Sequence, residues 1–413
     1  MTELAVNTVK TIRDFILSGI DMKRPAPKAP ADAFWAGLLK AGTEIWLDTG
    51  DIDAARKQWT AEMTALTTNN TLLNREIQKG IYDDFIKEAD GILKDLDRKE
   101  RIVEIAFILN ARHGLRLVQE FGGRVSVELH TDLANDLEGI VAYGRRFHEI
   151  SPDRFIVKVP LTATGLLGAR KLRELSIPVN FTLEFSARQN VLATVIAKPN
   201  YCNVFLGRLN AFVADNDLGT GDWVGEKTTI ASQRAIRMAG EGLREPTKQI
   251  AASLRSGQQL ESLAGVDVFT MPTKVAAEGH ETIKSPFRDR TSENYEVELR
   301  DSVDPTEVRI DCLWEVDDAL LRFAGEIDAN PPKSGRELED RAHRAGYGEL
   351  FPHLTAVQLE TVAKEGKVPV HRSWKGAIER HEVAVDTLLN LAGLASFTAD
   401  QAEMDKRVSG LIR

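Results

Sequence analysis

Short apolar runs alternate with longer stretches of helical apolar spacing between residues 41 and 275. The short runs are rich in β-branched and aromatic residues, so they predict buried strands. They cover residues 44–49, 65–69, 125–129, 155–159, 178–183, 202–207, 249–255 and 266–271. Helical spacing is typical of "AARKQWTAEM" (54–63), "EIQKGIYDDFIKEADGILKDL" (76–96) and "ATGLLGARKLREL" (163–175).

This alternation predicts an α/β fold with a parallel sheet, because each strand is followed by a helical segment that can cross over to the next. Eight such units favour a sheet that closes on itself, a (β/α)8 TIM barrel. The main alternative is an open flavodoxin-like sheet, which usually stops at about five or six strands. We therefore expect the barrel.

The two flanks of this region have a different pattern. Proline-rich residues 22–32 predict a linker after an N-terminal helix, and acidic residues 292–308 predict an exposed segment. Beyond residue 310 the apolar spacing is helical, and Thr398 with Gln401 forms a capping-box pattern that predicts a helix start. We expect an N-terminal helix and linker (1–40), a barrel (41–275) and a long C-terminal helical extension (276–413) that packs on the barrel and covers its mouth.

A barrel carries its chemistry at the carboxyl ends of its strands. Polar residues interrupt the predicted strands at or just after those ends, where each buried polar group needs a partner. They are Asp48, Asn69, Glu128, Lys158, Asn180, Thr182, Asn203, Arg208 and Arg255. Solvated strand ends would explain two or three such residues but explain a full ring poorly.

Lys158 lies inside the apolar run "RFIVKVP". Taken alone, it is most simply a lysine that reaches solvent or pairs with a carboxylate. Burial would instead lower the pKa of its amine and make it a nucleophile toward a ketone, so that the protonated imine accepts electrons when a C–C bond breaks. The two carboxylates would move protons, and the two arginines suit a phosphate. The ring therefore predicts a Schiff-base aldol reaction on a sugar phosphate.

Composition and charge narrow the class of protein. A net charge of −9 and a pI near 5.6 argue against binding to nucleic acid or to an acidic membrane surface. Two cysteines form neither a disulfide framework nor a metal motif, and no apolar run reaches membrane-spanning length. Glycine-rich nucleotide motifs and HExxH are absent from the sequence. We expect a cytoplasmic protein without metal or cofactor.

The motifs around these residues resemble those of the transaldolases. "KVPLTATG" fits the pattern K-x-P-x-T-x-x-G around a Schiff-base lysine, and "VNFTLEFSARQ" fits [CV]-N-x-T-L-x-F-S-x-x-Q. "WLDTGDID", "TTNNTLL", "RVSVEL", "FLGRLN" and "AASLRS…LAGVDVFTMP" resemble the remaining family segments, in order, from residue 46 to about residue 274.

The resemblance implies a role for each residue of the ring. Lys158 would form the Schiff base, Asp48 would exchange a proton with the C4 hydroxyl, and Glu128 and Thr182 would position a relay water. The remaining residues would bind substrate: Asn69 and Asn180 at the hydroxyls of the three-carbon unit, Asn203 in contact with that unit, Arg208 and Arg255 at the phosphate, and Phe205 as a further substrate contact. Phenylalanine at Phe205 favours a transaldolase, because the related fructose-6-phosphate aldolases have tyrosine there.

The resemblance further implies transfer of dihydroxyacetone from sedoheptulose 7-phosphate or fructose 6-phosphate to glyceraldehyde 3-phosphate or erythrose 4-phosphate, in the pentose phosphate pathway. Sugar phosphates would be its ligands, and the chain would be a monomer or homodimer. Two departures affect this expectation: Asn70 replaces a usual proline, so the loop after the second strand could be less rigid, and Asn203 replaces a usual serine. An aldolase or transaldolase-like enzyme for another sugar, or a non-catalytic sugar-phosphate-binding barrel, stays open as an alternative.

Overall fold

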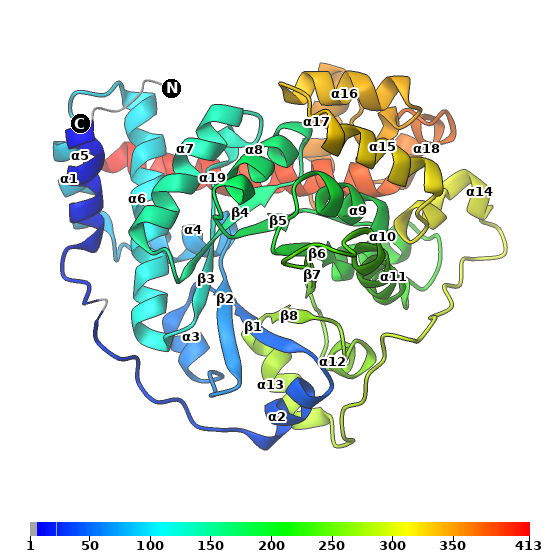
Figure 1. The fold of residues 1–413 in the computed structure, drawn as a ribbon, viewed down its shortest axis with the longest axis horizontal. Coiled ribbons are helices and arrows are strands. Elements are labelled where there is room, and N and C mark those ends of the chain that lie inside the picture. Colours follow the sequence, from blue (N-terminus) through cyan, green and yellow to red (C-terminus); the bar gives the residue numbers. More distant parts are fainter. Residues whose placement is uncertain (1–5, 22) are drawn as a thin grey trace.

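The computed structural model describes residues 6–21 and 23–413, and its centre is a closed barrel of eight parallel strands in sequence order (Figure 1). The strands are β1 (Glu44–Asp48), β2 (Met63–Thr67), β3 (Arg124–Glu128), β4 (Phe155–Pro160), β5 (Val179–Thr182), β6 (Tyr201–Phe205), β7 (Lys248–Ala252) and β8 (Val268–Met271). The predicted α/β barrel is therefore confirmed.

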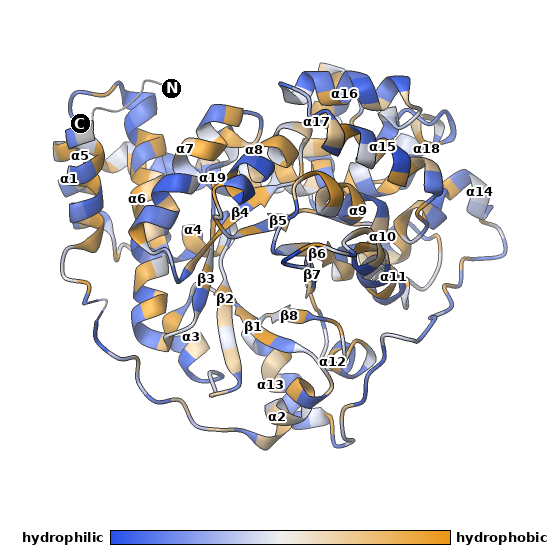
Figure 2. Ribbon diagram, viewed as in Figure 1, coloured by the Kyte–Doolittle hydropathy of each residue, from blue (hydrophilic) through white to orange (hydrophobic). Residues whose placement is uncertain are grey.

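The strands are buried on both faces, because helices cover the outside and side chains fill the inside. Every position of β4 and β6 is buried, and Figure 2 shows mostly apolar residues along the strands, whereas α6 alternates between apolar and polar residues. The barrel helices are α3 (Ile52–Arg56), α4 (Asn70–Gln78), α5 (Asp83–Ile92), α6 (Arg98–Phe121), α7 (Leu137–Ile150), α8 (Ala163–Glu174), α9 (Ala187–Ile196), α10 (Leu206–Asp215), α11 (Val224–Ala239), α12 (Gln258–Ser262) and α13 (Thr273–Thr282), with the short 3-10 helix η1 (Thr131–Leu133) before α7.

Two predicted helices were wrong in extent. The stretch 54–63 is helical only to Arg56, the end of α3, and its last residue already belongs to β2. The stretch 76–96 is not one helix, because Gly80 takes a left-handed backbone (φ 81°) between α4 and α5. The 24-residue helix α6 had not been identified from the sequence.

The N-terminal segment wraps around the outside of the barrel (Figure 1). Helix α1 (Val6–Leu17) packs against α5 and α6, where the Phe15 and Phe85 rings stack with centroids 4.3 Å apart. The described residues of the proline-rich segment have no helix or strand, and α2 (Ala33–Lys40) follows, capped by Asp32.

The C-terminal extension is helical and ends in one long helix. It contains α14 (Pro305–Val308), η2 (Ile310–Leu313), α15 (Asp318–Ala329), α16 (Gly335–Arg344), η3 (Gly348–Leu350), α17 (Ala356–Glu365), α18 (His371–Glu379) and α19 (Val385–Leu411). The predicted helix start at Thr398 was wrong, because Thr398 lies inside the continuous helix α19.

A buried ionic network joins this extension to the barrel. Arg188 in α9 donates through Nε and Nη2 to both carboxylate oxygens of Asp386 in α19, at 2.8 and 2.9 Å. Its Nη1 donates to Glu349 at 2.6 Å, and Ser186 Oγ donates to Asp386 at 2.6 Å. Asp386 is fully buried, so its charge depends on these donors.

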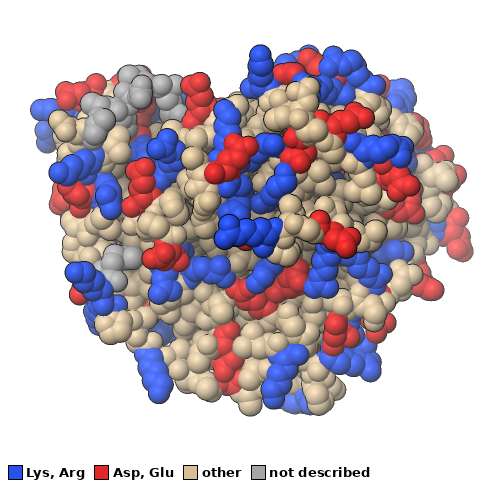
Figure 3. Space-filling model, viewed as in Figure 1, with Lys and Arg blue, Asp and Glu red and all other residues tan. Residues whose placement is uncertain are grey.

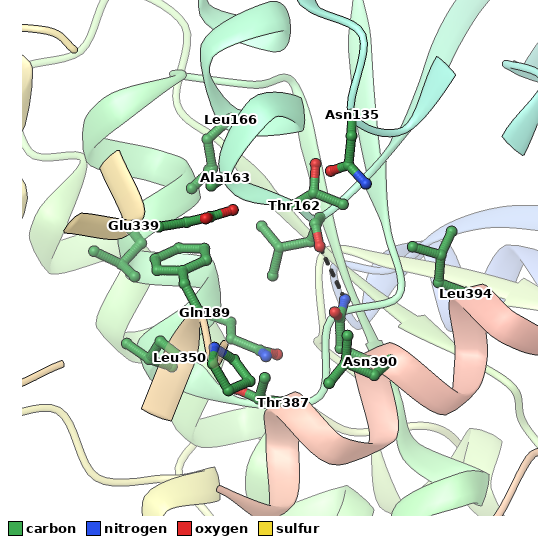
Figure 4. Close-up of a pocket in the computed structure, with 15 residues that line it drawn as sticks. Asn135, Thr162, Ala163, Leu166, Gln189, Glu339, Leu350, Thr387, Asn390 and Leu394 are labelled. Carbon is green, nitrogen blue, oxygen red and sulfur yellow. Dashed lines mark hydrogen bonds between the residues drawn. The ribbon is translucent and has the colours of Figure 1, made fainter. Parts of the chain in front are cut away.

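One turn further along α19, Asn390 donates to the carbonyl oxygens of Leu161 (3.1 Å) and Leu183 (2.7 Å), which follow β4 and β5. Figure 4 shows Asn390 beside a cavity of about 160 Å³ between barrel and extension. The amide satisfies two carbonyl groups that the strands leave free, so α19 is fixed directly to the carboxyl ends of the barrel strands.

We predict that Asp386→Ala lowers the free energy of unfolding by about 3–5 kcal/mol, because it leaves the Arg188 guanidinium buried without its bidentate partner. Equilibrium urea unfolding measures this. The control is Glu360→Ala, which removes an exposed ion pair with Lys364 and should change the stability by less than about 0.5 kcal/mol. Equal stability of the two variants would show that the network does not hold the extension.

Candidate active site

Lys158 lies in a polar layer across three neighbouring strands. The strand register aligns Glu128 of β3 and Asn180 of β5 with Lys158 of β4. Only 4% of Lys158 is exposed, its Nζ lies 3.5 Å from Glu128 Oε2, and it donates to the carbonyl oxygen of Thr68 at 3.1 Å. The ammonium group therefore does not reach solvent as a free surface lysine would.

Two carboxyl groups lie near this lysine in environments that favour their neutral forms. Burial raises the pKa of Glu128, against the opposing effects of Lys158 and the backbone N–H of Asn70. Burial also raises the pKa of Asp48 at the end of β1, opposed by Lys158 and by Thr67, whose Oγ1 donates to Asp48 at 2.7 Å. Raised carboxyl pKa values suit groups that accept and return protons.

Asparagine at position 70, where the family usually has proline, directly affects Glu128. Asn70 is the first residue of α4, a position where proline is favoured because its fixed φ suits a helix start. Proline has no N–H, whereas the backbone N–H of Asn70 hydrogen-bonds to Glu128. Asn69 caps the same helix by accepting from the Leu72 N–H at 2.9 Å.

Thr182 and Asn180 complete the inner part of the ring. Both are fully buried, and Asn180 donates to Ser126 Oγ at 3.0 Å. Among the described residues, Thr182 Oγ1 has no hydrogen-bond partner, and Glu128 Oε2 has only the ion-pair contact with Lys158 at 3.5 Å. Because buried polar atoms are costly to leave unpaired, these two atoms suit a substrate hydroxyl or a water molecule.

The hydrogen bonds of Asn203 show how an amide in place of the usual serine changes the site. Its side-chain amide donates to Asn180 Oδ1 at 2.8 Å and also to the carbonyl oxygen of Phe181. The larger amide thus holds Asn180 by its acceptor oxygen. A serine hydroxyl, shorter than this amide, would not occupy both partners in the same way.

The ring opens into a cavity of about 370 Å³ at the carboxyl ends of the strands. Seven of the predicted residues line it: Asp48, Asn69, Lys158, Asn203, Phe205, Arg208 and Arg255. Glu128, Asn180 and Thr182 lie behind this lining and do not border the open cavity.

Arg208 and Arg255 come from α10 and from the loop after β7. Burial and the neighbouring Arg255 lower the pKa of Arg208 to about 10, and its Nη1 has no hydrogen-bond partner in the described part of the chain. Gly207 permits this approach, because a Cβ there would collide with the Ser253 carbonyl oxygen and the Arg255 side chain. Ser253 has a φ of 62°, so the backbone is strained between β7 and Arg255.

Several residues of the site were not identified from the sequence. Thr67 holds Asp48, Glu184 is a fully buried carboxyl, and Arg75, Lys367 and Phe397 line the cavity. Thr67 is the last residue of β2, but the strand predicted at residues 65–69 placed that end two residues later, so the rule missed it. Lys367 and Phe397 come from the extension, where no local pattern marks a residue that reaches the barrel mouth.

This arrangement can perform imine chemistry with proton transfer. It offers one buried amine, two carboxyl groups with raised pKa values, polar groups for hydroxyls and a buried guanidinium for an anion. Among the described residues, no group of three or more His, Cys, Asp or Glu side chains is placed to hold a metal ion. None of the described helices has the length and apolar character needed to cross a membrane.

The fold and site define a (β/α)8 barrel with a lysine–carboxylate centre, and comparison with known proteins agrees. Residues 45–311 match the family model described as Transaldolase/Fructose-6-phosphate aldolase. A transaldolase of Xanthomonas euvesicatoria is 30% identical over 243 residues, 56% of this chain and 74% of its own. A probable transaldolase of Thermus thermophilus is 31% identical over 250 residues, 60% of this chain and 93% of its own.

The chain therefore belongs to the transaldolase/fructose-6-phosphate aldolase family, as the motifs predicted. Its function is of the transaldolase or aldolase type.

Glu184 gives this site a testable pH dependence. Burial raises the pKa of Glu184 to about 8, whereas an unfolded glutamate has a pKa of about 4.3. Between these values the folded protein holds a proton that the unfolded chain releases, so the free energy of unfolding falls as pH rises, by about 1.4 kcal/mol per pH unit. We predict that Glu184→Gln removes this slope and is more stable than wild type at high pH.

Urea unfolding over a pH series measures the effect. Glu88→Gln, at an exposed position of α5, is the matched control and should keep the wild-type slope. If Glu184→Gln retained the same slope as wild type, Glu184 would not be the group that binds this proton.

Proposed function

We propose that this protein is a transaldolase that moves a dihydroxyacetone unit from a ketose phosphate to an aldose phosphate through a Schiff base on Lys158. The observation that carries the proposal is the burial of Lys158 beside Glu128, with Asp48 close enough for its pKa to respond to Lys158. Sedoheptulose 7-phosphate and fructose 6-phosphate are the proposed donors, and glyceraldehyde 3-phosphate and erythrose 4-phosphate the acceptors.

In the first half of the reaction, the Lys158 amine adds to the C2 carbonyl carbon of the ketose, and loss of water gives a protonated imine. Asp48 then takes the C4 hydroxyl proton, the C3–C4 bond breaks, and its electron pair moves into the imine to form an enamine. The first aldose leaves as an aldehyde.

In the second half, the enamine carbon attacks the acceptor aldehyde, Asp48 returns its proton to the new hydroxyl, and water releases the product ketose from Lys158. Glu128 and Thr182 are the proposed partners of the water that enters and leaves. Among the described residues Thr182 Oγ1 has no hydrogen-bond partner and Glu128 Oε2 has only its ion pair with Lys158, which supports this role.

Two aromatic rings support transfer over release of free dihydroxyacetone. Phe205 lines the cavity beside Arg208, and Phe397 of α19 lies with its ring centroid 5.9 Å from Lys158 Nζ. These apolar rings limit access of water to an enamine on Lys158, so the intermediate survives until an acceptor arrives. The pentose phosphate pathway, a cytoplasmic location and a monomeric or homodimeric state stay predictions.

The first experiment is reduction with borohydride in the presence of fructose 6-phosphate, followed by mass spectrometry. We expect a reduced dihydroxyacetone adduct on Lys158 in the wild type, because borohydride converts the imine to a stable secondary amine. Lys158→Ala should show no adduct and should lose transferase activity. No adduct with any ketose phosphate would contradict the imine mechanism and favour a binding role.

A transaldolase-like enzyme with a different donor sugar is the second candidate, and the Asn203–Asn180 hydrogen bond favours it. We predict that Asn203→Ser frees Asn180 Oδ1 and raises kcat/KM for fructose 6-phosphate by about fivefold, the worth of roughly one hydrogen bond. Steady-state kinetics across several ketose phosphates test this, with Asn203→Ala as the control that adds no hydroxyl. Unchanged ratios among donors in both variants would show that Asn203 does not select the donor.

A further inference from the structure

The mouth of the cavity holds more positive charge than one phosphate needs. Besides Lys158, five cationic residues line it: Arg75, Arg208, Arg255, Lys274 and Lys367. None of these five side chains forms an ion pair within the described part of the chain. The whole protein carries a net charge of −9, and the face drawn in Figure 3 mixes both signs, so this cationic lining is a local feature.

Four of these cations act on one another. Burial lowers the pKa of Lys367, Asp400 opposes this effect, and Arg208, Arg75 and Arg255 lower the pKa further. Only 6% of Arg208 is exposed, and its Nη1 has no hydrogen-bond partner in the part of the chain that the structure describes. Mutual repulsion of this kind destabilises the folded chain, so its presence at a cavity indicates an anionic ligand.

The cations come from different parts of the barrel rim. Arg208 and Arg255 follow β6 and β7, whereas Arg75 belongs to α4, which follows β2. In a closed barrel of eight strands, β2 and β6 are four strands apart and face each other across the axis. With a phosphate held by Arg208 and Arg255, Arg75 has Asp48 as a carboxyl neighbour and acts together with Lys367.

Lys367 reaches the mouth from the loop between α17 and α18, outside residues 45–311 that match the family. Asp400 of α19 opposes the lowering of the pKa values of Lys367 and Arg208. Its carboxylate accepts a hydrogen bond from the hydroxyl of Thr71 in α4. Asp48, which lines the cavity, acts on Arg75 and Arg255, and these two carboxyl groups are fewer than the six cationic residues of the lining, Lys158 included. The extension thus adds a positive charge that the matched part of the family does not supply.

We propose that Arg75 and Lys367 form a second anion-binding subsite at the cavity mouth, which takes a second phosphoryl group on the sugar whose first phosphate binds Arg208 and Arg255. This assignment rests on the proposed function for the position of the first phosphate. A sugar bisphosphate would accordingly bind more tightly than the monophosphate donors proposed above.

Calorimetric titration of the full chain tests the subsite with two carbonyl-free probes, propyl phosphate and propane-1,3-diol bisphosphate, at constant ionic strength. Neither probe forms an imine, so the result is independent of the Lys158 chemistry. We expect the bisphosphate to bind wild type at least about tenfold more tightly, the worth of one charge-assisted contact. Lys367→Ala and Arg75→Ala should each remove most of this advantage and leave the Kd of propyl phosphate within about twofold.

Lys364→Ala is the matched control, because Lys364 is an exposed lysine of α17 that pairs with Glu360 and does not line the cavity. It should keep the bisphosphate advantage, whereas Arg208→Ala should weaken both probes. Thermal unfolding of each variant verifies that it is folded.

Equal affinity of wild type for both probes would overturn the second subsite. If Lys367→Ala weakened the binding of both probes by the same factor, Lys367 would act through the general positive potential of the cavity, and this outcome would also overturn the second subsite. If two propyl phosphates bound per chain and the bisphosphate bound no more tightly, the subsite would take a separate phosphate ion. That outcome would overturn its assignment to the second phosphoryl group of one sugar. If borohydride trapping on Lys158 failed while the bisphosphate advantage persisted, only the proposed reaction would be wrong.

Discussion

The buried Lys158 ammonium is the constraint around which the interior of this barrel is arranged. An ammonium group removed from water must find acceptors nearby, and here they are Glu128 Oε2 at 3.5 Å and the Thr68 carbonyl oxygen at 3.1 Å. The carboxylate is itself buried, so it in turn depends on Lys158 and on the Asn70 backbone. The resulting polar layer is possible only because parallel strands in register bring the ends of β3, β4 and β5 to the same height.

The residues that differ from the usual family pattern act within this layer. Asn203 donates to Asn180, and the Asn203 N–H donates to Glu184 Oε1 at 3.2 Å. Glu184 is fully buried, with a pKa of about 8 caused by burial. These contacts fix the orientation of Asn180 from one side and place a largely neutral carboxyl behind it. The substitution at Asn203 is thus part of a local rearrangement of hydrogen bonds that reaches beyond a single exchanged side chain.

The apolar runs identified most of the barrel, because strands buried on both faces leave a continuous hydrophobic signal. Glu128, Lys158 and Asn203 were recognisable because a charged or amide residue interrupts such a run. The boundaries were less predictable: Gly80 ends a helix through its backbone conformation, and Thr398 resembles a cap although it lies within α19. Lys367 could not be placed at all from the sequence, because its position depends on how the extension docks through Arg188, Asp386 and Asn390.

Helix α19 also affects access to the cavity, because its Phe397 is part of the cavity lining. It is 27 residues long and is fixed near its start by Asp386 and near its end by Arg407, which donates to Asp83 at 2.8 Å. A helix held near both ends does not swing open as a short lid does, so we expect Phe397 to stay beside the cavity. Exchange with solvent would then need only side-chain rotation, a motion of picoseconds to nanoseconds, and no slow backbone opening. For the proposed intermediate on Lys158, this arrangement would give shelter from water without a separate opening step.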